Sequence, residues 1–198
     1  MKLFLHSGDL DEIRQQHQRG VCSGVTVADE KRAAQGEPAR RAWLSAIAAI
    51  APAPVCVTVG AADQNDMTAE AMALGGLAAN IVVGLPPTAA GLAAMAACTR
   101  AGFPTRLCGY RSPADVEFGA RAGAQWFTPA LDASAGAFDV ADMVRLAVGA
   151  RRVYARSSPL LVGPLRTMEQ AIDAGAAGAE AASVTASVMR RVRAPTGA

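Results

Sequence analysis

Residues 80–92 read Asn-Ile-Val-Val-Gly-Leu-Pro-Pro-Thr-Ala-Ala-Gly-Leu, which combines a strand, a loop and the start of a helix. The β-branched run Ile81–Val83 predicts a short buried strand, and Pro86 and Pro87 stiffen the loop that follows it. The alanine-rich segment Ala89–Ala101 predicts a helix that ends at Gly102. An apolar strand followed by a helix is the repeating unit of a parallel α/β sheet.

The same unit recurs along the whole chain. The predicted strands are Leu3–Leu5, Gly24–Thr26, Val55–Val59, Ile81–Val83, Thr105–Cys108, Trp126–Thr128, Arg152–Ala155 and Glu180–Val184. After a first helix with Ser7 or Asp9 as its N-cap, the predicted helices are Pro38–Ile50, Met67–Leu77, Ala89–Ala101, Pro113–Ala122, Asp139–Val148 and Leu165–Ala174. The glycines expected to end helices before the next strand are Gly102, Gly123 and Gly175. This order predicts an α/β fold, a (β/α)8 TIM barrel, as a single domain over residues 1–198.

Composition narrows the classes of function. The net charge is +2 with both signs mixed, so charge gives no reason to expect a nucleic-acid partner. Proline and glycine interrupt the two charge-free stretches, residues 42–62 and 71–99, so neither predicts a membrane span. The first few residues are too short for a signal peptide, and we expect a cytoplasmic protein.

The four cysteines, Cys22, Cys56, Cys98 and Cys108, are far apart in the sequence and form no C-x-x-C motif. Zinc sites usually combine such a motif with clustered histidines, so we expect no metal site. Nothing in the sequence implies a cofactor. Reduced thiols, mostly buried, are the expected state of these residues.

Several segments, in the right order, resemble one enzyme family. They are the opening Met-Lys-Leu-Phe-Leu-His-Ser-Gly-Asp-Leu-Asp-Glu-Ile-Arg at 1–14, Gly-Val-Thr at 24–26, the run at 80–92, Ala-Gly-Phe-Pro-Thr at 101–105 and Ala-Gly-Ala-Gln-Trp-Phe-Thr-Pro at 122–129. Together they resemble the small transaldolase and fructose-6-phosphate aldolase family. The resemblance covers nearly the whole chain and implies a TIM barrel.

The resemblance also implies a lysine in the fourth strand, where the family forms a Schiff base with its substrate. Gly84 stands at that position, and the only lysines of the chain are Lys2 and Lys31. A glycine has no amine, so the family reaction cannot run from this position. Lys31 follows the second predicted strand and is the one candidate for a substitute amine.

Other family positions differ as well. His6 stands for the aspartate of the first strand, Val27-Ala28-Asp29 for the Thr-Asn-Pro of the second, Thr58 for an acid or amide of the third, Cys108 for the water-positioning threonine of the fifth, and Ala133 lies near the phosphate-binding arginine. Thr26 matches a family threonine, and Ser157 is the candidate for the phosphate-binding serine of the seventh strand. The last helix is shortened to about Ala186–Arg193, which weakens the family's expectation of a ring-shaped oligomer, although a smaller homo-oligomer is still expected.

The active site of a TIM barrel lies at the carboxyl ends of its strands. This rule places at the mouth His6, Ser7, Thr26, Asp29, Thr58, Cys108, Tyr110, Arg111, Asp132, Arg156 and Ser157. The predicted catalytic residues are His6, Cys108 and Asp29. The predicted substrate-binding residues are Thr26, Thr58, Tyr110, Arg111, Asp132, Arg156 and Ser157.

Each prominent candidate has a chemical role and a plain alternative. His6 suits proton transfer at neutral pH. The alternative is that it results from drift in a site that is no longer under selection. Cys108 could be a nucleophile if His6 lies within hydrogen-bond reach, or a small buried thiol. Arg111 or Arg156 could bind an anion, whereas Asp132 would repel a phosphate.

Three functions stay open at this point. The first is a repurposed enzyme of the lyase, isomerase, dehydratase or cyclase type, which uses acid–base chemistry without an imine on a small polar metabolite. The second is a non-catalytic protein that binds a small ligand or a partner protein. The third is an aldolase or transaldolase of carbohydrate metabolism that uses Lys31.

Overall fold

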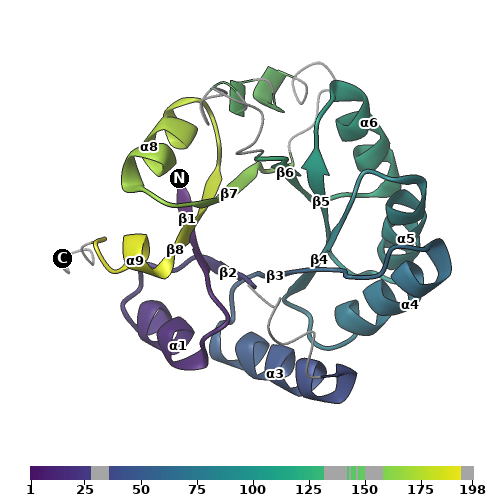
Figure 1. The fold of residues 1–198 in the computed structure, drawn as a ribbon, viewed down its shortest axis with the longest axis horizontal. Coiled ribbons are helices and arrows are strands. Elements are labelled where there is room, and N and C mark those ends of the chain that lie inside the picture. Colours follow the sequence, from purple (N-terminus) through teal and green to yellow (C-terminus); the bar gives the residue numbers. More distant parts are fainter. Residues whose placement is uncertain (28–35, 132–141, 143, 146, 150–157, 193–198) are drawn as a thin grey trace.

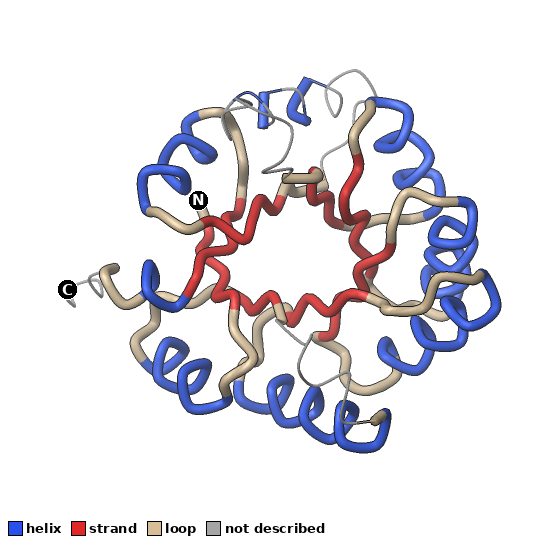
Figure 2. The backbone as a smooth tube through the Cα atoms, in the orientation of Figure 1, coloured by secondary structure: helices blue, strands red, loops and turns tan. Residues whose placement is uncertain are grey.

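The computed structural model describes residues 1–27, 36–131, 142, 144, 145, 147–149 and 158–192. Within them, eight parallel strands form one sheet in the order β6-β5-β4-β3-β2-β1-β8-β7. The strands are β1 (Lys2–His6), β2 (Gly24–Thr26), β3 (Val55–Thr58), β4 (Ile81–Leu85), β5 (Thr105–Tyr110), β6 (Trp126–Pro129), β7 (Leu161–Leu165) and β8 (Ala181–Thr185). Figure 2 shows the strands as an inner ring with the helices outside it.

The helices surround the sheet as the predicted barrel requires (Figure 1). They are α1 (Leu10–Gln18), α3 (Glu37–Ile50), α4 (Gln64–Gly75), α5 (Ala89–Arg100), α6 (Pro113–Ala122), α8 (Met168–Ala176) and α9 (Ala186–Met189). The outer strands β6 and β7 meet through a parallel bridge between Phe127 and Leu160. The prediction of a (β/α)8 TIM barrel is therefore confirmed.

Local sequence explains where these helices begin. Asp9, and not Ser7, is the N-cap of α1, and its carboxylate accepts hydrogen bonds from the backbone N–H groups of Asp11 and Glu12. Ser112 and Asp115 form a reciprocal capping box at the start of α6. Gly123 ends that helix in the left-handed conformation with φ 102°, as predicted for this glycine.

The seventh strand differs from the sequence prediction. It is Leu161–Leu165, whereas the predicted segment Arg152–Ala155 lies outside the described residues. Gly163 and Pro164 inside β7 read as a turn in the sequence. The sheet accommodates them by a register shift between Val162 and Leu165.

Three boundaries after β7 also change. The helix predicted from Leu165 is α8, which starts at Met168 because Thr167 caps it. Gly175 lies inside α8, and the glycine with a left-handed φ of 110° is Gly178. The last helix, α9, is shorter than the predicted Ala186–Arg193 and ends at Met189.

The sheet has a separate apolar core on each face. Side chains such as Ile47, Met95 and Leu107 fill the larger core between strands and helices. A smaller cluster consists of Phe4, Cys56, Val82, Leu161 and Ala181, with Trp126 packed against it. Since alternate residues of a strand point to opposite faces, this cluster fills the barrel interior, and we name these six residues the apolar plug.

None of the helices in the described part of the chain is long and apolar enough to span a membrane.

Candidate active site

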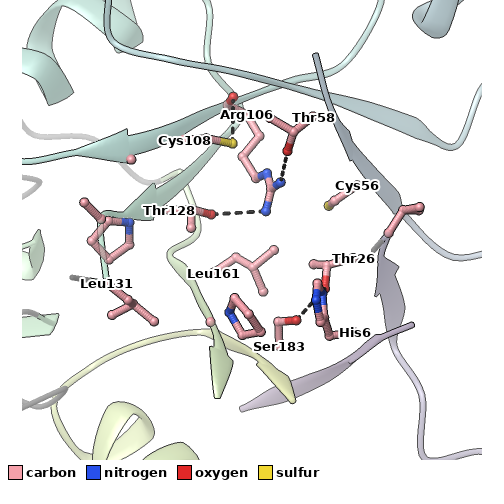
Figure 3. Close-up of a pocket in the computed structure, with 16 residues that line it drawn as sticks. His6, Thr26, Cys56, Thr58, Arg106, Cys108, Thr128, Leu131, Leu161 and Ser183 are labelled. Atoms are coloured by element: carbon pink, nitrogen blue, oxygen red, sulfur yellow. Dashed lines mark hydrogen bonds between the residues drawn. The ribbon is translucent and has the colours of Figure 1, made fainter. Parts of the chain in front are cut away.

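A cavity of about 310 Å³ opens at the carboxyl ends of the strands (Figure 3). The described residues that line it are His6, Thr26, Val27, Cys56, Thr58, Arg106, Cys108, Gly109, Thr128, Pro129, Ala130, Leu131, Leu161, Gly163, Pro164 and Ser183. Among these lining residues there is no lysine, aspartate or glutamate. We name His6, Thr26, Thr58, Arg106, Cys108, Thr128 and Ser183 the polar layer.

The apolar plug closes the barrel below this cavity. Phe4 and Trp126 pack edge to face, with ring centroids 5.6 Å apart. Gly24 leaves room for the Phe4 ring, because a Cβ atom on it would lie only 2.4 Å from a ring carbon. Cys56 and Leu161 belong to the plug and also line the cavity, so they form its floor.

His6 belongs to a hydrogen-bonded row on one side of the cavity. Its Nδ1 lies 3.1 Å from Thr26 Oγ1, which in turn lies 2.5 Å from Ser183 Oγ. The row crosses β1, β2 and β8, which are neighbours in the sheet. The two hydroxyl groups therefore hold the imidazole ring at the end of its strand, as Figure 3 shows.

Gly84 lies in β4, between Thr58 and Arg106 in the register of the sheet. A Cβ atom on Gly84 would lie 2.8 Å from Cys108 Sγ, 3.0 Å from Thr58 Oγ1 and 3.1 Å from the Val57 carbonyl oxygen. Such distances are shorter than normal contacts between nonbonded atoms. Neighbouring side chains thus fill the space that a side chain at position 84 would need.

Arg106 extends from β5 into the cavity on the side opposite His6 (Figure 3). Only 7% of its surface is exposed, and its Nη1 and Nη2 donate to Thr128 Oγ1 and Thr58 Oγ1 at 3.4 Å each. Its Nε has no hydrogen-bond partner among the described residues. Burying a guanidinium costs several kcal/mol unless it is paired and fully hydrogen-bonded.

Cys56, beside the guanidinium, does not supply a negative charge at pH 7. Burial raises the pKa of Cys56 to about 11, so this thiol is neutral at pH 7. For Arg106, burial alone would lower the pKa, but the interactions with Cys108 and Cys56, including a hydrogen bond with Cys108, outweigh burial and raise it. Arg106 is therefore a charged guanidinium at every ordinary pH.

Cys108 does not pair with His6. The hydrogen bond of its thiol goes to the Arg106 carbonyl oxygen, at a sulfur–oxygen distance of 3.7 Å. In Figure 3 the two side chains lie on opposite sides of the cavity. The Cys–His nucleophile considered from the sequence therefore lacks the contact that it requires.

Three other predicted mouth residues lie away from the cavity lining. Ser7 is buried, and its hydroxyl donates to Glu12 at 2.7 Å. Tyr110 packs edge to face on Phe127 in the outer core, because a register shift between Cys108 and Tyr110 interrupts the alternation of β5. Arg111 is exposed, and its backbone N–H donates to the Asp115 carboxylate.

The remaining predicted residues, Asp29, Asp132, Arg156 and Ser157, lie outside the described residues, as does Lys31. The strand-end rule assigns Arg156 and Ser157 to the mouth because they follow the segment predicted as the seventh strand. In the structure they precede β7 in the chain, so that argument no longer applies to them.

Among the lining residues that the sequence does not predict, four have a charged, hydroxyl or thiol side chain: Cys56, Arg106, Thr128 and Ser183. Cys56 and Ser183 stand two residues before the ends of their strands, and Thr128 stands one residue before the end of its strand. Arg106 stands four residues before the end of β5, and all four side chains are on the inward face. The alternation of β5 places Arg106 on the same face as Cys108, which is the signal that could have indicated it. Within the described residues, no group of three His, Cys, Asp or Glu side chains could hold a metal ion.

Comparisons with known proteins agree with this architecture. No protein-family model matches the chain. It is 30% identical over 195 residues to a protein named "probable transaldolase" from Sorangium cellulosum (strain So ce56), covering 97% of this chain and 89% of the relative. It is 31% identical over 193 residues to another of that name from Heliobacterium modesticaldum (strain ATCC 51547 / Ice1), covering 97% and 89%.

Solved structures share the fold. A 3-hexulose-6-phosphate synthase has a TM-score of 0.71 and 17% sequence identity, covering 98% of this chain and 99% of its own. A thiamine phosphate pyrophosphorylase from Pyrococcus furiosus has a TM-score of 0.64 and 15% identity, covering 98% and 89%. The class of the protein is thus a TIM barrel with a polar cavity at its carboxyl end. By its sequence relatives, the chain belongs to the transaldolase family.

Proposed function

We propose that this member of the transaldolase family forms no Schiff base and transfers protons on a small polar metabolite in the mouth cavity. The observation that carries the proposal is the lining of the cavity. His6 is its single described residue with an ordinary pKa near neutrality, and no described lining residue is a lysine. His6 is therefore the acid–base group of the proposed reaction.

The contacts of His6 suit that role. In the tautomer that carries its proton on Nδ1, this N–H donates to Thr26 Oγ1, whose hydroxyl donates to Ser183 Oγ. In this tautomer Nε2 carries the basic lone pair of the ring, and it is the nitrogen that we assign as the proton acceptor. Thr26 and Ser183 fix the orientation of the ring and stabilise the imidazolium that forms.

Besides the absence of a lysine from the described lining, the surroundings of Gly84 support a reaction without an imine at this position. The position lacks an amine, and the adjacent Cys108 and Thr58 occupy the volume through which a lysine would leave the strand. The interior is therefore adapted to a glycine at this position. A single change back to lysine would disturb both neighbours.

Isomerases, dehydratases and many lyases share a first step that needs no imine. His6 accepts a proton from a carbon next to a carbonyl group, and the electron pair of the C–H bond moves into the carbonyl to give an enol or enolate. For a hydroxyketone or hydroxyaldehyde, return of the proton to the former carbonyl carbon, with transfer of the hydroxyl proton to the former carbonyl oxygen, completes an isomerisation. Delivery of the proton to a departing β-hydroxyl group releases water and completes a dehydration.

The shared step allows a test before the substrate is known. The protein is incubated in D₂O with a panel of small hydroxyketones, hydroxyaldehydes and hydroxy or keto acids, and proton NMR follows the exchange of carbon-bound hydrogen. We expect exchange in at least one compound, and a loss of at least a hundredfold in the variant His6→Gln. The matched control is His17→Gln, because His17 is the other histidine of the chain and lies in α1, away from the cavity lining.

A non-catalytic binding protein is the alternative, and the separation of Cys108 from His6 favours it, since these two residues form no catalytic pair. In that case the wild-type protein would bind small ligands in the cavity without exchange of any carbon-bound hydrogen. Equal exchange in wild type and His6→Gln would reject His6 as the acid–base group.

A further inference from the structure

We propose that Arg106 is the anion-binding residue of this cavity and that the natural ligand is a small monocarboxylate with hydroxyl groups. The inference deepens the proposed function and rests on it, because it names the substrate class for the same cavity. Arg106 is not among the residues that the sequence predicts, and it is the charged side chain that the fold places deepest in the polar layer.

The first support is the unfinished hydrogen bonding of the guanidinium. A guanidinium carries five N–H donors, and two of those of Arg106 reach hydroxyl groups at 3.4 Å, which is long for this kind of bond. Its Nε, also buried, has no partner in the described part of the chain. Arg106, which also interacts with the Cys108 side chain, is thus incompletely hydrogen-bonded, and a ligand in the cavity can complete its bonding.

The second support is the charge of the lining. None of the described residues that line the cavity is an aspartate or glutamate, so no lining carboxylate among them neutralises Arg106. Cys56 is a neutral thiol at pH 7 because burial raises its pKa to about 11. A buried charge of this kind is stabilised by an anion that fits a planar fork of donors, and a carboxylate does.

The third support is the balance between the charge of one anion and the cations among the described lining residues. Arg106 alone neutralises a monocarboxylate, whereas a phosphate dianion would also require protonated His6. The hydroxyl groups of Thr58 and Thr128 flank the guanidinium, and those of Thr26 and Ser183 lie beside His6. Such a lining suits a ligand that carries hydroxyl groups along a short carbon chain.

The arrangement also connects the two sides of the cavity. Arg106 and His6 approach from opposite sides in Figure 3, with the cavity between them. A carboxylate held by Arg106 directs the rest of the molecule toward the imidazole. Arg106 would therefore decide which molecule binds and how it is oriented, while His6 exchanges the proton.

Isothermal titration calorimetry and thermal unfolding test the inference with glycolate, glycerate and gluconate as probes. Glycerol is the neutral counterpart, and inorganic phosphate is the competing anion. We expect at least one carboxylate to bind wild type and raise its Tm, with glycerol inactive. The variant Arg106→Met should bind at least tenfold more weakly. Arg111→Met is the matched control, because Arg111 directly follows the same strand but lies outside the cavity lining.

The Tm of the unliganded variants separates binding from a structural role. If Arg106 serves a ligand, Arg106→Met keeps or raises the unliganded Tm, because it removes a buried charge that lacks a counter-ion. A lower Tm in Arg106→Met, or no binding of any of the three carboxylates to wild type, would overturn the inference. Binding of phosphate alone through Arg106 would overturn the carboxylate assignment.

Failure of this inference can be told from failure of the proposed function. His6→Gln should bind the carboxylate within threefold of wild type, while it loses hydrogen exchange. Carboxylate binding without any exchange in wild type would reject the proton-transfer function and leave the Arg106 site in place. Exchange that persists in Arg106→Met at wild-type rates would reject the Arg106 site and leave the proton-transfer function in place.

Discussion

The two halves of the barrel interior are built from the same strands but have opposite chemistry. The apolar plug packs at the amino end, where Phe4 and Trp126 meet edge to face and Gly24 leaves them room. The polar layer follows at the carboxyl end and contains a histidine and a buried arginine. In β1, Phe4 and His6 are only two residues apart on the same face.

This contrast distinguishes the apolar plug, which stabilises the fold, from the polar layer, whose residues can bind a ligand. The plug gains free energy from burial of apolar surface and requires nothing from a ligand. The polar layer holds a guanidinium without a carboxylate partner among the described residues, which opposes folding. Because burial of the polar layer opposes folding, we infer that this layer serves binding. Three substitutions, read by their effect on the free energy of unfolding, test the difference between the two halves.

The largest effect is expected in the plug. Phe4→Ala should lower the free energy of unfolding by about 3–5 kcal/mol, because it leaves a cavity beside Gly24. Chemical denaturation measures this change. In the double variant Phe4→Ala/Gly24→Ala, the added methyl group should recover part of the loss, although Gly24→Ala alone is destabilising. A cost of Phe4→Ala below about 1 kcal/mol would show that the plug is not tightly packed.

The next effect concerns the boundary between the two halves. Gly84→Ala should destabilise the protein by about 1–3 kcal/mol, because its methyl group would overlap Cys108 and Thr58. Cys108→Ala in the same chain should relieve part of this cost, which a double-mutant cycle measures. The control is Gly149→Ala, because a Cβ atom there meets nothing within 4 Å. Equal effects at the two glycines would contradict the account of a filled interior.

The smallest effect lies behind the polar layer. Glu70 accepts hydrogen bonds from Arg40 at 2.6 Å and from the backbone N–H of Ala61 at 2.8 Å, and Arg40 also donates to the Thr58 carbonyl oxygen. Burial alone would raise the pKa of Glu70, but these donors outweigh it and lower the pKa. Glu70→Gln should therefore cost about 1–2 kcal/mol at pH 7.

The pH dependence of that cost has a definite sign. A carboxylate with a lowered pKa in the folded state stabilises the protein above its unfolded pKa of about 4.3, and this stabilisation is lost as the pH falls through the folded value. The unfolding free energies of wild type and Glu70→Gln should therefore converge in acid. A difference that stays constant from pH 7 to pH 3 would contradict the assignment.

Much of the fold follows from the sequence, because β-branched runs such as Ile81–Val83 and the helices that follow them mark each βα unit. β7 escapes prediction because Gly163 and Pro164 resemble a turn, and a register shift is needed to keep them in the sheet. Of the candidate site, His6, Thr26, Thr58 and Cys108 are predictable as strand ends and do line the cavity.

The positions of Arg106 and Tyr110 depend on depth in the barrel and on a local irregularity of β5. Arg106 lies deep in the barrel beside Gly84, a relation that only the sheet register reveals. Tyr110 leaves the inward face because Gly109, with φ 75°, interrupts the alternation of β5. Neither feature can be read from a strand-end rule alone.

The most direct test of the central claim, that this transaldolase-family barrel works without an imine, is borohydride trapping read by intact mass. The protein is treated with borohydride in the presence of fructose 6-phosphate or dihydroxyacetone, beside the relative from Sorangium cellulosum (strain So ce56) as a control. We predict no stoichiometric adduct on this chain. A stoichiometric adduct that disappears in Lys31→Arg would contradict the account and establish Lys31 as the Schiff-base residue.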